Sequence, residues 1–84
     1  MGIRPLSLMH PGERGEIVGL QGGRGLVSRL NALGLTVGTE IEVVNNAFVG
    51  PLIVLVRDSR LVLGRGEANK IIVRPLPPKM PKGK

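Results

Sequence analysis

The sequence contains no cysteine, tryptophan or tyrosine, and it has a single histidine, His10, and a single phenylalanine, Phe48. The absence of cysteine excludes a disulfide framework, a thiolate zinc site and an iron–sulfur cluster. The scarcity of aromatic residues leaves no platform on which single-stranded bases could stack. No apolar run approaches the length of about 20 residues that spans a bilayer, and the first residues lack the apolar segment of a secretory signal. We therefore expect a cytoplasmic protein without membrane insertion.

The composition predicts one small domain built from short elements. The chain has 84 residues, of which 42% are hydrophobic, with 13 glycines and seven prolines. A chain of this size forms a single thin core, and the many glycines and prolines favour tight turns and short strands. The net charge is +6, but three lysines lie in the last six residues, and residues 1–74 carry nine basic against six acidic side chains. The domain itself is therefore only mildly basic.

A short helix is predicted over residues 26–33. Leu26, Leu30 and Leu33 recur at steps of four and three, which places them on one helical face. Gly34 follows at the position where a helix ends in a residue with positive φ. Eight residues do not form a stable helix alone in water, so packing of the leucine face must hold it.

Strict alternation follows this helix and predicts a half-buried strand over residues 39–45. Ile41 and Val43 are expected on the buried face, and Glu40 and Glu42 on the solvated face.

The remaining elements are also short. We expect further strands at 14–20, 52–57, 60–63 and 71–74, a two-residue connection at 58–59, and one helical turn at 67–70. Five short strands with one inserted helix describe a mainly β, SH3-like, partly open barrel. An OB-fold is the nearest competitor, but its helix lies between the third and fourth strands, whereas here the helix follows the first. The domain is predicted to cover residues 1–75, followed by a basic, Pro/Lys-rich disordered tail at 76–84.

The third strand is apolar on both faces. We assign Leu52, Val54 and Val56 to the core. Ile53 and Leu55 then point outward, where either the helix or the tail covers them, or they form an exposed patch for self-association or a partner.

No residues assemble into a recognisable catalytic or cofactor motif. His10 has neither a second histidine nor a cysteine with which to share a metal. The loop Gly22-Gly23-Arg24-Gly25 lacks the lysine and hydroxyl of a phosphate-binding loop. Glu40 and Glu42 are explained as a solvated strand face. We therefore predict that the protein is not an enzyme and has no cofactor and no resident metal.

Four groups of residues between about 5 and 75 carry a resemblance to a known family. They are Pro11-Gly12-x-x-Gly15-x-Ile17, Arg29-Leu30-x-x-Leu33-Gly34-Leu35-x-x-Gly38-x-x-Ile41-x-Val43, Gly50-Pro51-x-x-Val54 and Leu61-x-Leu63-x-x-x-Glu67-Ala68-x-x-Ile71. With this pattern the chain resembles the ferrous iron transport protein A (FeoA) family.

This resemblance implies an SH3-like barrel that is not an enzyme. It implies a small cytoplasmic partner of ferrous iron transport protein B, the membrane permease with a GTP-binding domain, in bacterial and archaeal Fe(II) uptake. The chain would then act as an adaptor at the inner face of the plasma membrane. Ile53 and Leu55 depart from the family, in which these positions are often polar.

From the resemblance and the pattern together, we predict two contact surfaces. The first surface comprises Leu26, Val27, Arg29, Leu33 and Leu35, and the second comprises Ile53 and Leu55 on the apolar third strand, where self-association is a further expectation. Two alternatives remain open. In the first alternative to the adaptor, the chain is an SH3-like nucleic-acid-binding module that uses its arginines and basic tail. In the second, it is a metal sensor in which carboxylates and His10 hold an ion. The proline-lysine tail is either a polyproline II ligand for another domain or a plain disordered tail.

Overall fold

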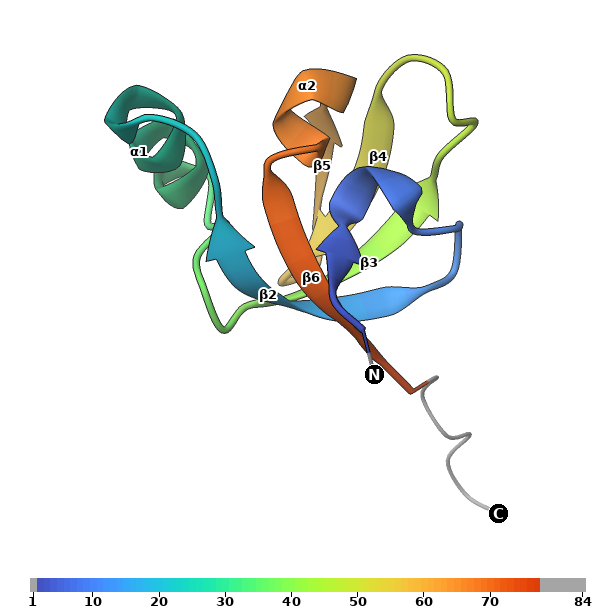
Figure 1. Ribbon diagram of the computed structural model, residues 1–84. Helices are drawn as coiled ribbons and strands as arrows, with labels where there is room; N and C mark the ends of the chain where they lie inside the picture. The colour runs from blue at the N-terminus through green and yellow to red at the C-terminus, as the bar shows by residue number, and fades with distance from the viewer. Residues whose placement is uncertain (1, 78–84) are drawn as a thin grey trace.

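A computed structural model describes residues 2–77 of the chain. Within this range six antiparallel strands form one curved sheet in the order β1-β6-β2-β3-β4-β5, with two α-helices and one 3₁₀ turn (Figure 1). The elements are β1 (Arg4–Pro5), η1 (Leu6–Leu8), β2 (Arg14–Leu20), α1 (Arg24–Ala32), β3 (Glu40–Asn45), β4 (Leu52–Val56), β5 (Ser59–Leu63), α2 (Arg65–Ala68) and β6 (Ile71–Leu76). The sheet curls into a partly open barrel whose edges are β1 and β5, and the mainly β architecture is as predicted.

The strand count is six rather than the predicted five. Arg4 and Pro5 form a short strand that pairs with Val73 and Ile72 of β6. No sequence pattern indicates β1, because a two-residue strand carries no alternation. Neither helix in the part of the chain described is long and apolar enough to cross a membrane.

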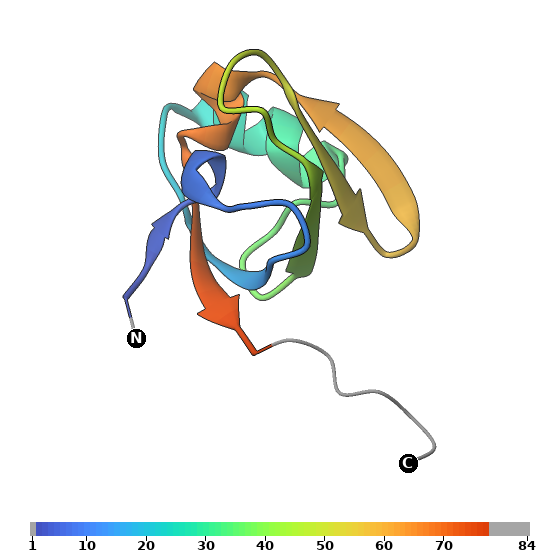
Figure 2. The ribbon, with the colours of Figure 1, turned by 90° about the vertical axis from the view of Figure 1, so that its right-hand side faces the viewer.

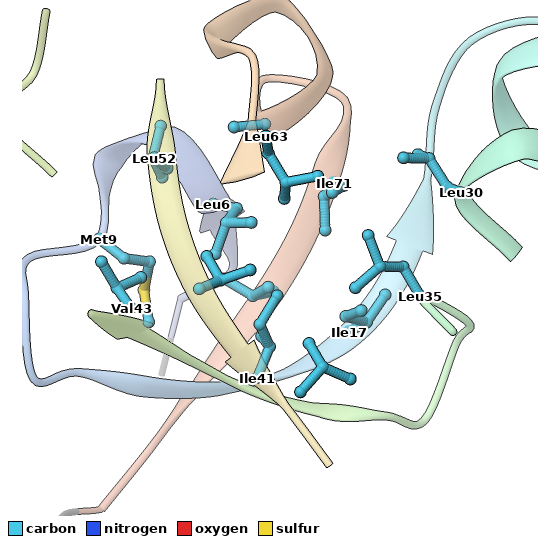
Figure 3. Packing of buried hydrophobic residues seen from close by; sticks show 14 residues of the cluster. Leu6, Met9, Ile17, Leu30, Leu35, Ile41, Val43, Leu52, Leu63 and Ile71 are labelled. Carbon is cyan, nitrogen blue, oxygen red and sulfur yellow. The ribbon is translucent and has the colours of Figure 1, made fainter. Parts of the chain in front are cut away.

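The core consists of aliphatic side chains from nearly every element. Leu52, Val54 and Val56 of β4 are buried, as predicted, and so are Ile41 and Val43 of β3. Figure 3 shows Leu30 and Leu35 closing the core beside α1, with Met9 and Val43 at the opposite end. Burial of these side chains stabilises the fold by roughly 25 cal/mol per Å² of apolar surface removed from water.

Strand β2 bends where it crosses between its neighbours. Its register with β6 shifts between Ile17 and Gly19, which marks a bulge there and agrees with the bend expected from a glycine inside a strand. A glycine inside a strand can also mark a site where another backbone approaches closely, and in β2 that site is Gly15 rather than Gly19. A Cβ atom at Gly15 would lie 3.2 Å from the carbonyl oxygen of Arg74 and 3.2 Å from Cβ of Val73. Gly15 is therefore the glycine that packing requires in this strand.

The β4–β5 connection differs from the predicted one. The two linking residues are Arg57 and Asp58, not Asp58 and Ser59, and both have positive φ, at 51° and 66°. This register places Leu52 opposite Leu63 and Val54 opposite Leu61. The predicted turn would have set Arg57 directly against Arg60, which like-charge repulsion disfavours. Figure 2 shows the resulting hairpin projecting from the side of the barrel.

Every boundary of the two helices and of the last strand lies within two residues of its predicted position. Helix α1 begins two residues earlier than predicted and ends at Ala32. Helix α2 also begins two residues earlier than its predicted turn. Strand β6 continues through Pro75 to Leu76 and pairs there with β2. Because β1 pairs only with residues 72 and 73, Pro75 faces an open edge, where a residue without an N–H is tolerated. The rest of the predicted tail, residues 78–84, lies outside the described residues.

Candidate functional site

The candidate chemical groups do not gather at one place. His10 is exposed, with its Nδ1 atom 3.6 Å from Oε1 of Glu13 and its ring edge-on to Phe48. Within residues 2–77 no three histidine, aspartate or glutamate side chains come close enough together to hold a metal ion. The features that remain as candidate sites are surfaces suited to contact with another chain.

Helix α1 provides the first of these surfaces. Figure 1 shows this helix to one side of the barrel, beyond β2. Leu30 is its only fully buried side chain, and Leu26 and Val27 are half-buried. Leu33, which caps the helix, is 44% exposed. The apolar stripe of α1 is thus only partly covered, and we refer to Leu26, Val27, Arg29 and Leu33 as the α1 face.

The end of α1 is a Schellman motif. Gly34, with φ of 91°, donates its N–H to the carbonyl of Asn31 at 3.0 Å, and Leu35 donates to the carbonyl of Leu30 at 2.9 Å. Leu30 and Leu35 are both fully buried, which supplies the apolar contact that accompanies this motif. The prediction of Leu35 as a contact residue is therefore wrong. Its side chain closes the core beneath the helix end and is not available to a partner.

An ion pair links α1 to α2. Nη2 of Arg29 lies 2.5 Å from Oε2 of Glu67, while Oε1 of the same carboxylate accepts the N–H of Gly64 at 3.2 Å. Glu67 thus caps the start of α2 and binds α1 at the same time. The Arg29 side chain is still more than half exposed, so it remains accessible at the edge of the α1 face.

The outer side of the sheet provides the second surface. Ile53 and Leu55 are half-buried, with Ile53 opposite Val62 and Leu55 between Glu42 and Arg60. Leu55 also lines a groove of about 390 Å³, which we call the acidic groove. Its other lining residues are Gly38, Thr39, Glu40, Ile41, Glu42, Arg57 and Asp58. The acidic groove shares no residue with the α1 face, so the two predicted surfaces are separate.

The arginines are dispersed over the molecule. Arg14 binds Glu40 at 2.7 Å, Arg74 binds Glu16, and Arg29 binds Glu67, each between different elements. The structure therefore does not bring them together into the dense basic face that phosphate binding favours.

A buried polar cluster surrounds Asn46, and the sequence pattern does not reveal it. The Asn46 amide nitrogen donates to the carbonyls of Ser7 at 3.0 Å and Met9 at 2.8 Å. Its oxygen accepts the N–H of Phe48 at 2.8 Å and Nη2 of Arg65 at 2.7 Å. The cluster fixes the loop that presents Phe48 and Val49 to solvent. An Asn-Asn pair after a strand signals a turn, but these partners lie too far away in the sequence to be inferred.

Comparison with known proteins identifies relatives over most of the chain. A family model described as the FeoA domain matches residues 4–75. A Methanocaldococcus jannaschii protein, provisionally named Fe(2+) transport protein A, is 33% identical over 69 residues, which cover 82% of this chain and 83% of that protein.

Solved structures agree with this match. A crystal structure described as the iron uptake regulatory protein FeoA has 37% identity and a TM-score of 0.85, covering 89% of this chain and all of that one. The Stenotrophomonas maltophilia FeoA structure, described as a prokaryotic SH3 domain protein complexed with zinc, has 25% identity and a TM-score of 0.74, covering 83% and 88%. The predicted SH3-like fold is confirmed.

Proposed function

The chain belongs to the FeoA domain family, and from that premise we propose that it is a non-enzymatic accessory protein of Fe(II) transport. In this proposal it docks on the cytoplasmic part of the ferrous iron permease, ferrous iron transport protein B. The names of its relatives, Fe(2+) transport protein A and iron uptake regulatory protein, support a place in this transport system. The Stenotrophomonas relative is itself described as a proposed ferrous iron transport activating factor.

The α1 face is the proposed docking surface. The observation that carries this choice is a helix beside the barrel whose apolar stripe the core covers only in part. Leu33 is 44% exposed at its end. Arg29 stands beside it and, although paired with Glu67, is 61% exposed, so a partner's acidic group can also reach it. Arginine is among the residues enriched at the energetic centre of protein contacts, and the exposed leucine beside it adds apolar area to be buried. Ile53 and Leu55 form the second, smaller candidate surface.

Binding to the permease from the same organism tests the proposal directly. The labelled chain is titrated against the purified permease at two salt concentrations, with RNA as a competitor. We expect saturable binding that RNA does not displace. Leu33→Glu should weaken binding about tenfold or more, because burying an unpaired carboxylate costs more than the roughly 1.4 kcal/mol that a tenfold change represents.

Val49→Glu is the matched control. Val49 is 82% exposed on the β3–β4 loop, and the same change of side chain there should leave the affinity unchanged. Equal binding by Leu33→Glu, Arg29→Glu and the unmodified chain would exclude the α1 face. No binding to the permease, together with salt-sensitive capture by RNA, would instead favour the nucleic-acid alternative.

A further inference from the structure

The acidic groove concentrates the negative charge of a basic protein. Three of the chain's six acidic residues line it, namely Glu40, Glu42 and Asp58, with Arg57 as its one basic residue. Residues 1–77 as a whole carry a net charge of +3, from nine basic and six acidic side chains. Leu55 adds an apolar surface to the groove. A groove of this kind fits an extended segment that carries both positive charge and apolar side chains.

Two of these carboxylates have no cationic partner among the described residues. Glu40 is bound by Arg14 at 2.7 Å, whereas Glu42 and Asp58 form no ion pair within residues 2–77. Glu42 is half-buried, so part of its surface is already removed from bulk water. A nearby cation would gain more from Glu42 than from a fully solvated carboxylate.

The chain itself contains a segment of matching chemistry. Residues 77–84 read Pro-Pro-Lys-Met-Pro-Lys-Gly-Lys, with three lysines and no acidic residue. Prolines favour the polyproline II conformation, which is already extended and loses little entropy on binding. The aromatic-lined grooves that bind PxxP segments are not the model here, because the acidic groove has no aromatic residue. The match rests on charge and on the apolar surface of Leu55.

The strand register brings this segment close to the groove. Leu76, the last residue of β6, pairs with Arg14, Arg14 pairs with Glu42, and Glu42 pairs with Leu55. Leu76 therefore lies two strand spacings from Glu42, which lines the groove. At roughly 4.8 Å per spacing, this distance is about 10 Å. Eight residues in polyproline II conformation span about 25 Å. The segment is long enough to reach the groove of its own molecule.

We propose that the basic proline-containing segment at 78–84 binds the acidic groove of the same molecule. Its lysines compensate Glu42 and Asp58, and its prolines and Met80 cover Leu55. This contact covers Leu55 on the outward face of β4 and leaves Ile53 beside Val62. The inference does not depend on docking through the α1 face, because the acidic groove shares no residue with that face and the contact needs no partner. It does compete with a partner for Leu55 of the second candidate surface.

A spin label on the full-length chain tests this placement. Because the sequence has no cysteine, Gly83→Cys gives a single attachment site and keeps all three lysines, the prolines and Met80. We expect a nitroxide there to cause loss of amide peak intensity at Glu40, Glu42 and Leu55, while Leu33 and Val49 keep theirs. The loss should diminish in 1 M salt, where the Debye length falls from about 10 Å to about 3 Å.

Charge variants in the labelled protein provide the controls. Glu42→Lys/Asp58→Lys should abolish the loss at Leu55, provided that dispersed peaks for Ile17 and Val54 show a folded core. Glu13→Lys, close to where the chain leaves the sheet, should leave the loss unchanged. Loss that persists in the double variant, or that is equal over the whole surface, would overturn the proposal. Loss in an isotope-labelled chain mixed with spin-labelled chain would also overturn it, by assigning the groove to a second copy.

Discussion

At the scale of single residues, the loop between β3 and β4 depends on one buried amide. Asn46 is 4% exposed and uses both its nitrogen and its oxygen in hydrogen bonds. Asn46→Ala leaves the carbonyls of Ser7 and Met9 buried without this donor, and it removes an acceptor from Arg65. We expect a loss of about 1–3 kcal/mol in the free energy of unfolding, measured by urea denaturation. Asn45→Ala, on the exposed neighbour, should change stability by less than about 0.5 kcal/mol, and equal effects would contradict this role for Asn46.

Replacing Gly15 or Gly66 with alanine should have opposite effects on stability, because only Gly15 is tightly packed. Gly15→Ala places a Cβ atom 3.2 Å from the Arg74 carbonyl oxygen, so we expect destabilisation of about 1–3 kcal/mol from overpacking. Gly66 lies inside α2, and no atom beyond its chain neighbours and the backbone of its own helix lies within 4 Å of the position that its Cβ would take. Gly66→Ala should therefore stabilise the protein by about 0.5–1 kcal/mol through helix propensity. Thermal unfolding of both variants measures the difference, and a stabilising Gly15→Ala would show that β6 moves away at no cost.

At the scale of elements, the sequence predicts those features of the helices and strands that depend on residues close together in the chain. The end of α1 and the alternation of β3 follow from the sequence, because Gly34 and the Ile41–Val43 pattern act within a few residues. The α1 residues of the candidate site are placed on one helix for the same reason. The burial of Leu35 beneath a helix end escapes prediction because it depends on the packing of the whole barrel. The Asn46 cluster escapes prediction because its partners come from distant segments.

The β4–β5 hairpin shows the same limit and yields a prediction. Asp-Ser is a common turn pair, but cross-strand pairing shifts the turn to Arg57 and Asp58, both in the left-handed region. This is the conformation of a type I′ turn, which favours Asn-Gly. Arg57→Asn/Asp58→Gly should raise stability by about 1 kcal/mol, seen as a higher Tm. Ser59→Gly, one residue later and without positive φ, should give no gain; a gain there instead would place the turn where the sequence suggested.

At the scale of the whole molecule, the outer side of β4 borders an open edge of the sheet. Val62 on β5 is 68% exposed beside Ile53, and β5 has no strand on its other side within the described residues. Self-association through this face stays a prediction. A sedimentation velocity series should show a concentration-dependent dimer that Val62→Lys removes and Val49→Lys does not. A single monomeric species at all concentrations would contradict it and leave Ile53 as an isolated surface residue.

The position of β6 also has a consequence for how the chain folds. This strand is the last of the six to be synthesised, yet it lies between β1 and β2, the first two. During translation neither early strand can gain this partner until residues 71–76 have left the ribosome, so the sheet cannot be completed before its last strand is made. Such long-range pairing gives a high contact order and predicts folding on a timescale of about milliseconds to seconds, slow for a domain of this length. In the meantime the apolar segments and unpaired strand edges remain exposed, which makes the incomplete chain prone to aggregation.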